Sequence, residues 1–329
     1  MPRTAGSLLA SLEQLARELA GAEGAALLGA RWTFALPRPE LRDALTEYSL
    51  PAGPEPFSAL LAARTGLRIV EGAAGELAGH LAAGRAAVVA VDVFHLPYRP
   101  AYGRVHSSRT VRVRAGPAPG QLWVDDDWPP ARHGPVDERV LERARHSPVP
   151  RDELREPLYA GRPVRGEWWA VELDEERLAG LRTEAEALLD ALRREALEDR
   201  EDAAGRYGPG ALDAFRRELE EGWAAGAPPR ALLRTASLLL RAELGSRVYL
   251  CALLSAVGRW TGCQRLTGEA AVYHRSLREM EVARDVLAKA LAGFRPEYAR
   301  FLGGCLARAA AAEERLAAFL ARRAAAGAL

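Results

Sequence analysis

The apolar period of this 329-residue chain changes near Asp174, and that change limits the folds open to it more than any other feature. Ahead of Asp174, apolar runs of strand length alternate with short helical patterns, whereas after it every apolar stripe has the period of a helix. Helices are predicted over roughly 175–200, 210–225, 230–257, 265–294 and 297–326, separated by breaks that contain glycine or proline. The sequence therefore predicts an α+β fold: an α+β domain over residues 1–174, then an all-α helical bundle over 175–329.

The first domain begins with an amphipathic helix over residues 7–20, in which leucines recur at helical spacing. Short helices are predicted over roughly 41–48, 56–66, 71–83 and 150–161. Strands are predicted over roughly 85–97, 109–114, 121–126 and 166–173, with the middle two joined as a hairpin through the turn "APGQ". The segment "DWPPARHGP" is expected to leave the sheet. Hairpin connections of this kind predict an antiparallel sheet.

The charge balance excludes several classes of partner. Forty-five basic and 44 acidic residues give a net charge of +1, so no overall field would draw the protein to nucleic acid or to an anionic membrane. No apolar run reaches the length of a membrane span, and the amphipathic start does not resemble a signal peptide, so a cytoplasmic protein is expected. No metal site or cofactor is predicted, because the three cysteines lack ligand spacing and no glycine loop cradles a phosphate.

The segment from Asp92 to Val113, "DVFHLPYRPAYGRVHSSRTVRV", holds the densest group of chemistry-bearing side chains. His106 lies just before a predicted strand, and "VDDDWPP" follows on the next strand; a histidine and a carboxylate so placed can act as a base and its orienting partner. His95, at the end of an apolar strand, could line a cleft or be a satisfied core residue. Ser7, at the start of the first helix, could be a nucleophile favoured by the helix dipole or simply a helix cap.

Four segments in this order resemble the butirosin-biosynthesis-H-type proteins: "LLGARWTF", "GRAAVVAVDVFHLPYRPAYGRVHSSRTVRVRAG", "LWVDDDWPP" and "GEWWAVELD". The resemblance covers approximately residues 5–175 and, more loosely, the helical remainder. It implies a papain-like, C39-peptidase-like N-terminal domain followed by a helical domain. It also implies acyl transfer from a carrier-protein thioester to a small-molecule amine or hydroxyl, with cyclisation or hydrolysis as variants, in nonribosomal-peptide and related antibiotic pathways. The partner would be an acyl or peptidyl carrier protein, and the substrate would be linked to phosphopantetheine.

The resemblance also implies where the catalytic residues should be: a cysteine at the start of the first helix, a histidine at the start of a strand and an aspartate on the next strand. This chain has Ser7 at the first position and Asp126 at the third, whereas the histidine is expected at Arg109 or Thr110. His106 lies three residues earlier, about 10 Å along an extended chain. The predicted catalytic set is Ser7, His106 and Asp126.

Six further residues are predicted to bind the substrate or its carrier. They are His95, Tyr98, Tyr102, Arg104, Arg109 and Arg112. The arginines would meet the acidic helix of a carrier protein or the phosphate of phosphopantetheine.

Two alternatives remain open at the level of sequence. In one, a histidine acts as a general base on a thioester and an amine that the cleft holds together, without a nucleophile. In the other, the absent cysteine marks a catalytically inactive papain-like domain that binds a carrier protein or a peptide, while the helical domain docks a partner or forms a homodimer.

Overall fold

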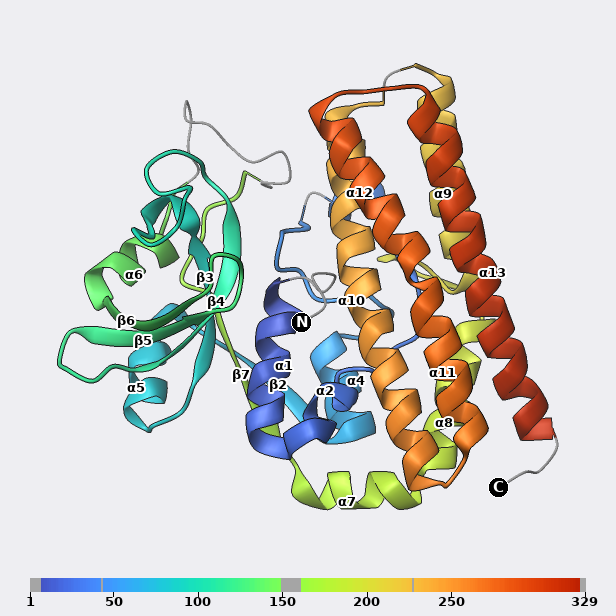
Figure 1. Cartoon of the computed structure of the whole chain (residues 1–329), viewed down its shortest axis with the longest axis horizontal. Helices are drawn as coiled ribbons and strands as arrows, with labels where there is room; N and C mark the ends of the chain where they lie inside the picture. Colours follow the sequence, from blue (N-terminus) through green and yellow to red (C-terminus); the bar gives the residue numbers. More distant parts are fainter. Residues whose placement is uncertain (1–6, 43, 149–160, 227, 326–329) are drawn as a thin grey trace.

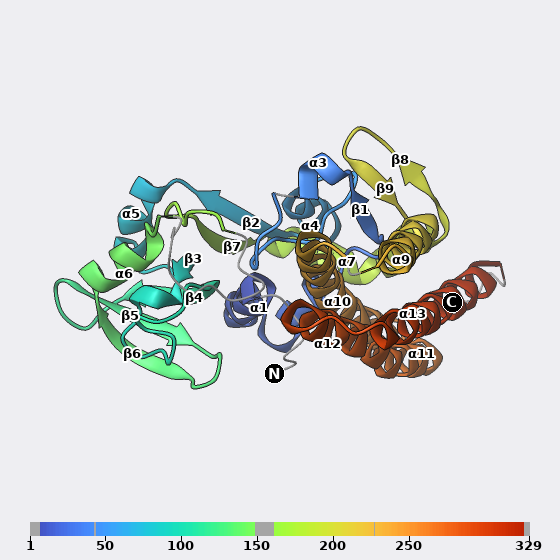
Figure 2. The same ribbon diagram turned by 90° about the horizontal axis from the view of Figure 1, so that it is seen from above.

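The computed structural model describes residues 7–42, 44–148, 161–226 and 228–325, and within them the fold is α+β. An antiparallel sheet with two short helices forms one side of the molecule, and a group of long helices forms the other (Figure 1). Helix α1 (Ser7–Ala20), which has the predicted bounds, lies between them in both views (Figures 1 and 2). The N-terminal helix is therefore in contact with both halves of the fold.

The sheet has six strands in the order β2-β7-β3-β4-β5-β6, and every neighbouring pair is antiparallel. Their bounds are β2 Leu67–Gly72, β3 Ala87–Asp92, β4 Ser108–Ala115, β5 Gln121–Asp126, β6 Arg132–Asp137 and β7 Trp168–Leu173. The predicted hairpin is confirmed, with Val113 of β4 opposite Val124 of β5. The prediction that residues 127–135 leave the sheet is wrong for their second half, because β6 returns to pair with β5.

The two faces of the sheet are covered by different elements. Helices α5 (Leu77–Ala82) and α6 (Glu138–Arg145) cover one face, where Val89 and Val91 are buried, and α1 covers the other, where Val88 and Ala90 are buried. Side chains alternate between faces along a strand, so a strand covered on both sides is apolar throughout. This is why β3 is an unbroken apolar run up to Asp92.

The segments before and after β2 are helical only in part. Helix α4 (Phe57–Thr65) was predicted and packs on β2, but the predicted helix over 71–83 is reduced to the 3₁₀ turn η2 (Ala74–Glu76) and α5. In the segment predicted as a helix over 41–48, α3 (Pro39–Arg42) ends at the first residues and 44–50 form turns and extended chain. The helix predicted over 150–161 lies outside the described residues, apart from its last residue.

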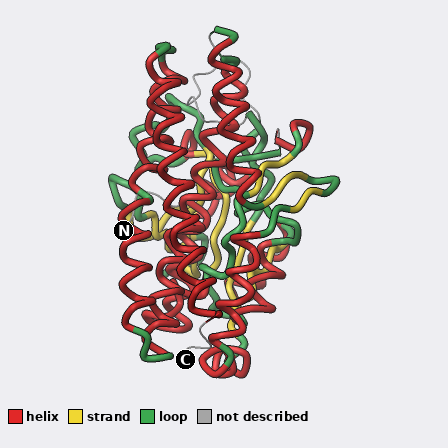
Figure 3. Tube along the Cα trace, turned by 90° about the vertical axis from the view of Figure 1, so that its right-hand side faces the viewer, coloured by secondary structure: helices red, strands yellow, loops and turns green. Residues whose placement is uncertain are grey.

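The C-terminal half is helical, close to the prediction. Its helices are α7 Glu175–Thr183, α8 Ala185–Leu197, α9 Pro209–Ala224, α10 Arg230–Trp260, α11 Gln264–Ser276, α12 Arg278–Ala292 and α13 Glu297–Ala325. Helices α11 and α12 were predicted as one helix, but the chain bends between them at Leu277. Figure 3 shows the long helices lying side by side, with the strands behind them. Across the described residues, no helix has the length and apolarity needed to cross a membrane.

The boundary predicted at residue 174 is not a break in packing. The larger of the two apolar cores of the described residues runs from Leu8 in α1 to Leu320 in α13, across the predicted boundary, and the smaller one lies on the other face of the sheet. The short strand β1 (Ala35–Pro37) pairs with β9 (Gly205–Tyr207), which forms a hairpin with β8 (Arg200–Glu201). None of these three strands was predicted, and neither was β2. Buried Arg247 of α10 donates to the main-chain oxygens of Trp32 (3.2 Å) and Thr33 (3.3 Å). The first 40 residues are thus part of the core of the helical half.

Candidate functional site

The start of α1 meets β4 at the place where the sequence predicted a nucleophile. The Ser7 hydroxyl accepts a hydrogen bond from the main-chain nitrogen of Thr110 at 3.2 Å, and the Ser11 and Thr110 hydroxyls lie 3.3 Å apart. Thr110 is one of the two positions at which the resemblance expects the base histidine. The helix start and the strand therefore come together as expected, but the group beside Ser7 is a threonine, which has no basic side chain.

His106 has a carboxylate partner, and it is Asp92. The Nδ1 atom of His106 lies 2.6 Å from Oδ2 of Asp92, and both side chains are buried. The imidazole stacks on the Phe94 ring with centroids 4.0 Å apart and planes 7° apart. The sequence-based pairing of His106 with Asp126 is thus corrected: the carboxylate that orients the ring is at the end of β3, not on β5.

Asp92 is the centre of a larger buried cluster, made of Asp92, His95, His106 and Ser147, which we call the Asp92 cluster. The Ser147 hydroxyl donates to Asp92 at 2.8 Å and lies 3.2 Å from Nε2 of His95. Main-chain nitrogens of Phe94 and Ser107 also donate to Asp92, at 3.1 and 3.3 Å. Four donors thus surround one fully buried carboxylate. Because each of its two oxygens is hydrogen-bonded, the buried charge is stabilised.

His95 is half-buried at the edge of this cluster, in the 3₁₀ turn η3 (Val93–His95). Burial lowers the pKa of its imidazole, Asp92 opposes this, and electrostatic interactions with His106 and Arg143 add to the lowering. His95 is accordingly held toward its neutral form, and because the Ser147 hydrogen is donated to Asp92, the Nε2–H of His95 donates to the Ser147 oxygen. Ser147 itself is buried, so this serine–histidine pair is placed for structure more than for access by a substrate.

Asp126 has a different environment from the one predicted for it. It forms a buried ion pair with Arg99, accepts from the Tyr98 hydroxyl at 3.4 Å, and accepts from the Trp128 main chain at 3.3 Å. Arg99 also donates to the main-chain oxygens of Trp128 and Pro130. Burial and the Asp126 charge raise the pKa of Tyr98 well above its usual value. Asp126 thus fixes the loop after η3 against the loop after β5.

The other predicted binding residues divide into two groups. Arg112 is paired with Glu18 of α1 and with Asp127, and Arg109 lies over the Trp128 ring at 5.5 Å from its centroid. Tyr102 and Arg104 are exposed on the loop between η3 and β4. Tyr102 is 50% exposed and Trp128, across the Arg99 contact, is 44% exposed. These loops therefore present two large aromatic side chains to solvent.

A groove of about 590 Å³ begins beside the first turn of α1; we call it the α1 groove. Its apolar wall contains Leu8, Tyr48 and Trp169, and the Tyr48 and Trp169 rings lie 5.7 Å apart. Its charged side chains are two arginines, Arg162 and Arg165, and two glutamates, Glu71 and Glu167; Arg165 is exposed. Leu8 follows Ser7 in the first turn of α1, but Ser7 is not among the lining residues of the groove, and its hydroxyl contacts β4. The volume and the mixed lining of the α1 groove suit an elongated ligand with an apolar or amide stem.

Sequence reasoning missed Asp92 and Ser147. Asp92 carried a usable signal, because it is a single acid in the apolar run "AAVVAVDVF", and an acid buried in such a run needs donors. Ser147 had no such signal, since its place beside Asp92 depends on the packing of α6 against β3.

No group of three or more histidine, cysteine, aspartate or glutamate side chains is placed to hold a metal ion within the four described ranges. No protein-family model and no curated protein matches this chain.

Proposed function

We propose that this chain is a catalytically inactive papain-like protein whose α1 groove binds the phosphopantetheine arm of an acyl or peptidyl carrier protein. One observation carries the proposal: the Ser7 hydroxyl is engaged by the Thr110 main chain, and a threonine stands where a base is needed. A serine needs an adjacent base to attack a thioester at neutral pH. The contact of α1 with β4 supports a papain-like arrangement. In this arrangement the substrate groove is present, but the nucleophile is not activated.

The chemistry of the groove supports this ligand class. Phosphopantetheine has a phosphate at one end and a chain of methylene and amide groups ending in a thiol. The wall of Leu8, Tyr48 and Trp169 would contact the chain, and the Arg165 guanidinium at the rim would meet the phosphate. The exposed Tyr102, Arg104 and Trp128 would contact the carrier protein itself. In this proposal the helical half is free to dock a further partner or a second copy.

Binding of 4′-phosphopantetheine tests the proposal by isothermal titration calorimetry. We expect saturable binding that weakens about fivefold to tenfold in Arg165→Gln and with rising salt, because a charge-assisted contact to phosphate is lost or screened. Arg85→Gln is the matched control, since Arg85 is equally exposed and lies away from the groove. Absence of binding, or equal affinity in both variants, would contradict binding of the phosphopantetheine arm in the α1 groove with its phosphate at Arg165.

A second candidate is favoured by the Asp92 cluster. An imidazole oriented by a carboxylate at 2.6 Å is the arrangement of a general base, so His106 could assist acyl transfer between a thioester and an amine without a covalent intermediate. Its burial argues against this use. Aminolysis of S-acetyl-phosphopantetheine that is lost in His106→Gln and kept in Ser7→Ala would select this candidate over the binding protein.

A further inference from the structure

A second pocket lies between the β8–β9 hairpin, the segment around β1 and α9. It has a volume of about 400 Å³ and is lined by four arginines and four glutamates, with Leu36 and Ala214 as apolar wall. The arginines are Arg38, Arg42, Arg206 and Arg217; the glutamates are Glu40, Glu201, Glu218 and Glu221. Their formal charges cancel, so the pocket has no net preference for an anion or a cation.

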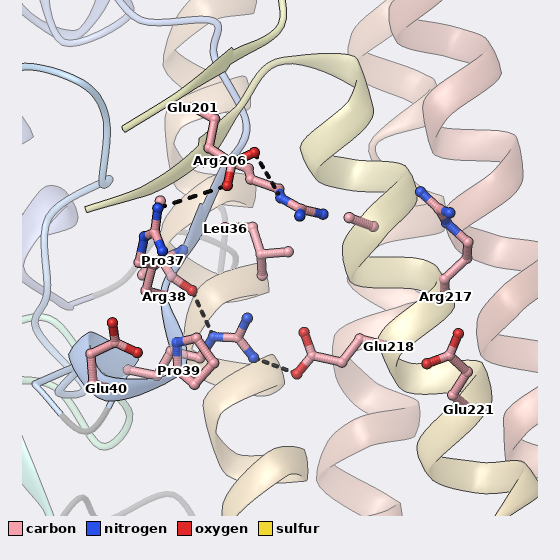
Figure 4. Close-up of a pocket in the computed structure, with 13 residues that line it drawn as sticks. Leu36, Pro37, Arg38, Pro39, Glu40, Glu201, Arg206, Arg217, Glu218 and Glu221 are labelled. Atoms are coloured by element: carbon pink, nitrogen blue, oxygen red, sulfur yellow. Dashed lines mark hydrogen bonds and ion pairs between the residues drawn. The ribbon is translucent and has the colours of Figure 1, made fainter. Parts of the chain in front are cut away.

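These charges are separated within the pocket. Figure 4 shows the guanidinium groups of Arg206 and Arg217 facing one another in its upper part and the carboxylates of Glu218 and Glu221 in its lower part. Arg206 is paired with Glu201 through Nε at 3.3 Å, and Arg217 with Asp213 through Nε at 3.4 Å. In each of these two ion pairs the contacting nitrogen is Nε. In Figure 4 both guanidinium groups border the same upper part of the pocket, so each can offer Nη donors to a ligand there.

The two glutamates that α9 contributes to the pocket differ in their partners. Glu218 forms an ion pair with Arg42, which also donates to the main-chain oxygen of Pro37 at 2.7 Å. Glu221 enters no ion pair among the described residues, although Arg217 lies one turn before it on α9. In a helix, an ion pair at this spacing is weaker when the arginine precedes the glutamate. This agrees with the absence of an ion pair between Arg217 and Glu221.

We propose that this pocket binds a small zwitterion, an α-amino acid with an apolar side chain being the simplest. Its carboxylate would accept from the Nη atoms of Arg206 and Arg217, and its ammonium group would donate to Glu221. Arg217 and Glu221 are about 5–6 Å apart along α9, a spacing that the two charged groups of one amino acid can bridge. The side chain would rest on Leu36. Surface ion pairs such as Arg206–Glu201 contribute little, so their rearrangement on binding costs little.

Three related ligands test this assignment by calorimetry or ligand-observed NMR. L-leucine carries both charges, its methyl ester lacks the carboxylate, and 4-methylpentanoate lacks the amine. We expect L-leucine to bind at least about tenfold more tightly than either analogue. Equal affinity for 4-methylpentanoate would overturn the proposal in favour of a plain anion site, and absence of leucine binding would overturn it outright.

Two variants locate the binding. Arg217→Gln and Glu221→Gln are each expected to weaken leucine binding at least fivefold; both side chains are exposed, so the fold should be retained, which the unfolding temperature checks. Arg230→Gln, at the exposed start of α10, is the control and should leave binding unchanged. Leucine binding that survives both pocket variants would place the ligand elsewhere and contradict the assignment. The result is independent of the α1 groove, because phosphopantetheine binding is measured with a different ligand at a different site.

Discussion

A single buried carboxylate organises the end of β3, where the sequence is richest in chemistry-bearing residues. Asp92 accepts from two side chains and two main-chain nitrogens, and so holds together η3, the two residues before β4 and Ser147, the second residue after α6. From the sequence, His106 could be singled out but not its partner, because residues 92 and 106 meet only through the pairing of β3 with β4. The sequence predicted Asp126 as the partner of His106, but Asp126 forms an ion pair with Arg99.

Loss of the Asp92 charge should destabilise the fold. Asp92→Asn keeps the size of the side chain but places an amide nitrogen, a donor, among groups that already donate, so the free energy of unfolding should fall by about 2–4 kcal/mol. Chemical denaturation measures it. Asp127→Asn is the matched control: Asp127 is partly exposed in a surface ion pair, and its loss should cost under about 1 kcal/mol. Equal effects of the two substitutions would contradict the central role of Asp92.

His95 should make stability depend on pH. Its pKa is lowered in the folded state, so below about 6.5 the unfolded chain binds a proton that the folded chain resists. Its contribution is therefore present above that pH and is lost as the pH falls. The free energy of unfolding is measured from pH 8 to pH 5 for the wild type and for His95→Gln. As the pH falls, the wild type should lose more stability than the variant. A difference that is constant over this range would show that His95 does not titrate differently on folding.

The elements were predicted best where apolar periodicity alone decides the structure. Helices α1, α4 and α10 begin within a residue or so of the predicted bounds, because their apolar stripes are long and their ends carry proline, glycine or a polar cap. Strand β6, "RHGPVD", has no apolar alternation and includes a glycine and a proline; only its pairing with β5 at the edge of the sheet makes it a strand. Strands β8 and β9 are too short to have a period.

The close approach of α2 (Gly24–Leu27) to α10 depends on a glycine directly after it. A methyl group at Gly29 would lie 2.1 Å from the main-chain oxygen of Tyr249, an atom that cannot move without bending α10. Gly29→Ala should therefore lower the free energy of unfolding by about 1–3 kcal/mol or more.

Gly268→Ala is the control for that substitution. Gly268 lies within α11 with open space around it, and alanine there should be neutral or stabilising by about 0.5–1 kcal/mol. Thermal unfolding of the two variants side by side gives the comparison. A Gly29 variant as stable as the wild type would mean that α2 and α10 are not in contact.

At the scale of the whole molecule, the two halves share a core and a buried ion network. Arg247 pairs with Glu243 of its own helix and with Glu313 of α13, while it donates to main-chain oxygens near β1. The sequence did not predict this network. Apart from Glu243, which is on the same helix, the groups that Arg247 contacts here are 66 or more residues away in the sequence. It explains why the period change near residue 174 marks a change of secondary structure and not a separation of two cores.

Glu243 should give this network a pH dependence. Burial raises the pKa of Glu243 to about 7; Arg247 opposes the shift and Glu313 adds to it. The folded chain therefore keeps a proton that the unfolded chain releases above about pH 4.5, so this contribution to stability is present at low pH and is lost as the pH rises through 7. Between about pH 4.5 and pH 7, the free energy of unfolding of the wild type should fall by about 3 kcal/mol relative to that of Glu243→Gln. Glu314→Gln, at an exposed position, is the control and should leave the pH dependence of stability as in the wild type. If Glu243→Gln also left it as in the wild type, the raised pKa of Glu243 would be contradicted.

The measurement that tests the central claim most directly is the intact mass of the protein after rapid mixing with S-acetyl-4′-phosphopantetheine and acid quenching. If Ser7 is engaged by Thr110 and lacks a base, the protein keeps its unmodified mass and the thioester decays no faster than in buffer. A mass increase of one acetyl group that disappears in Ser7→Ala would show a working serine nucleophile. That result would contradict a binding protein and establish covalent acyl transfer.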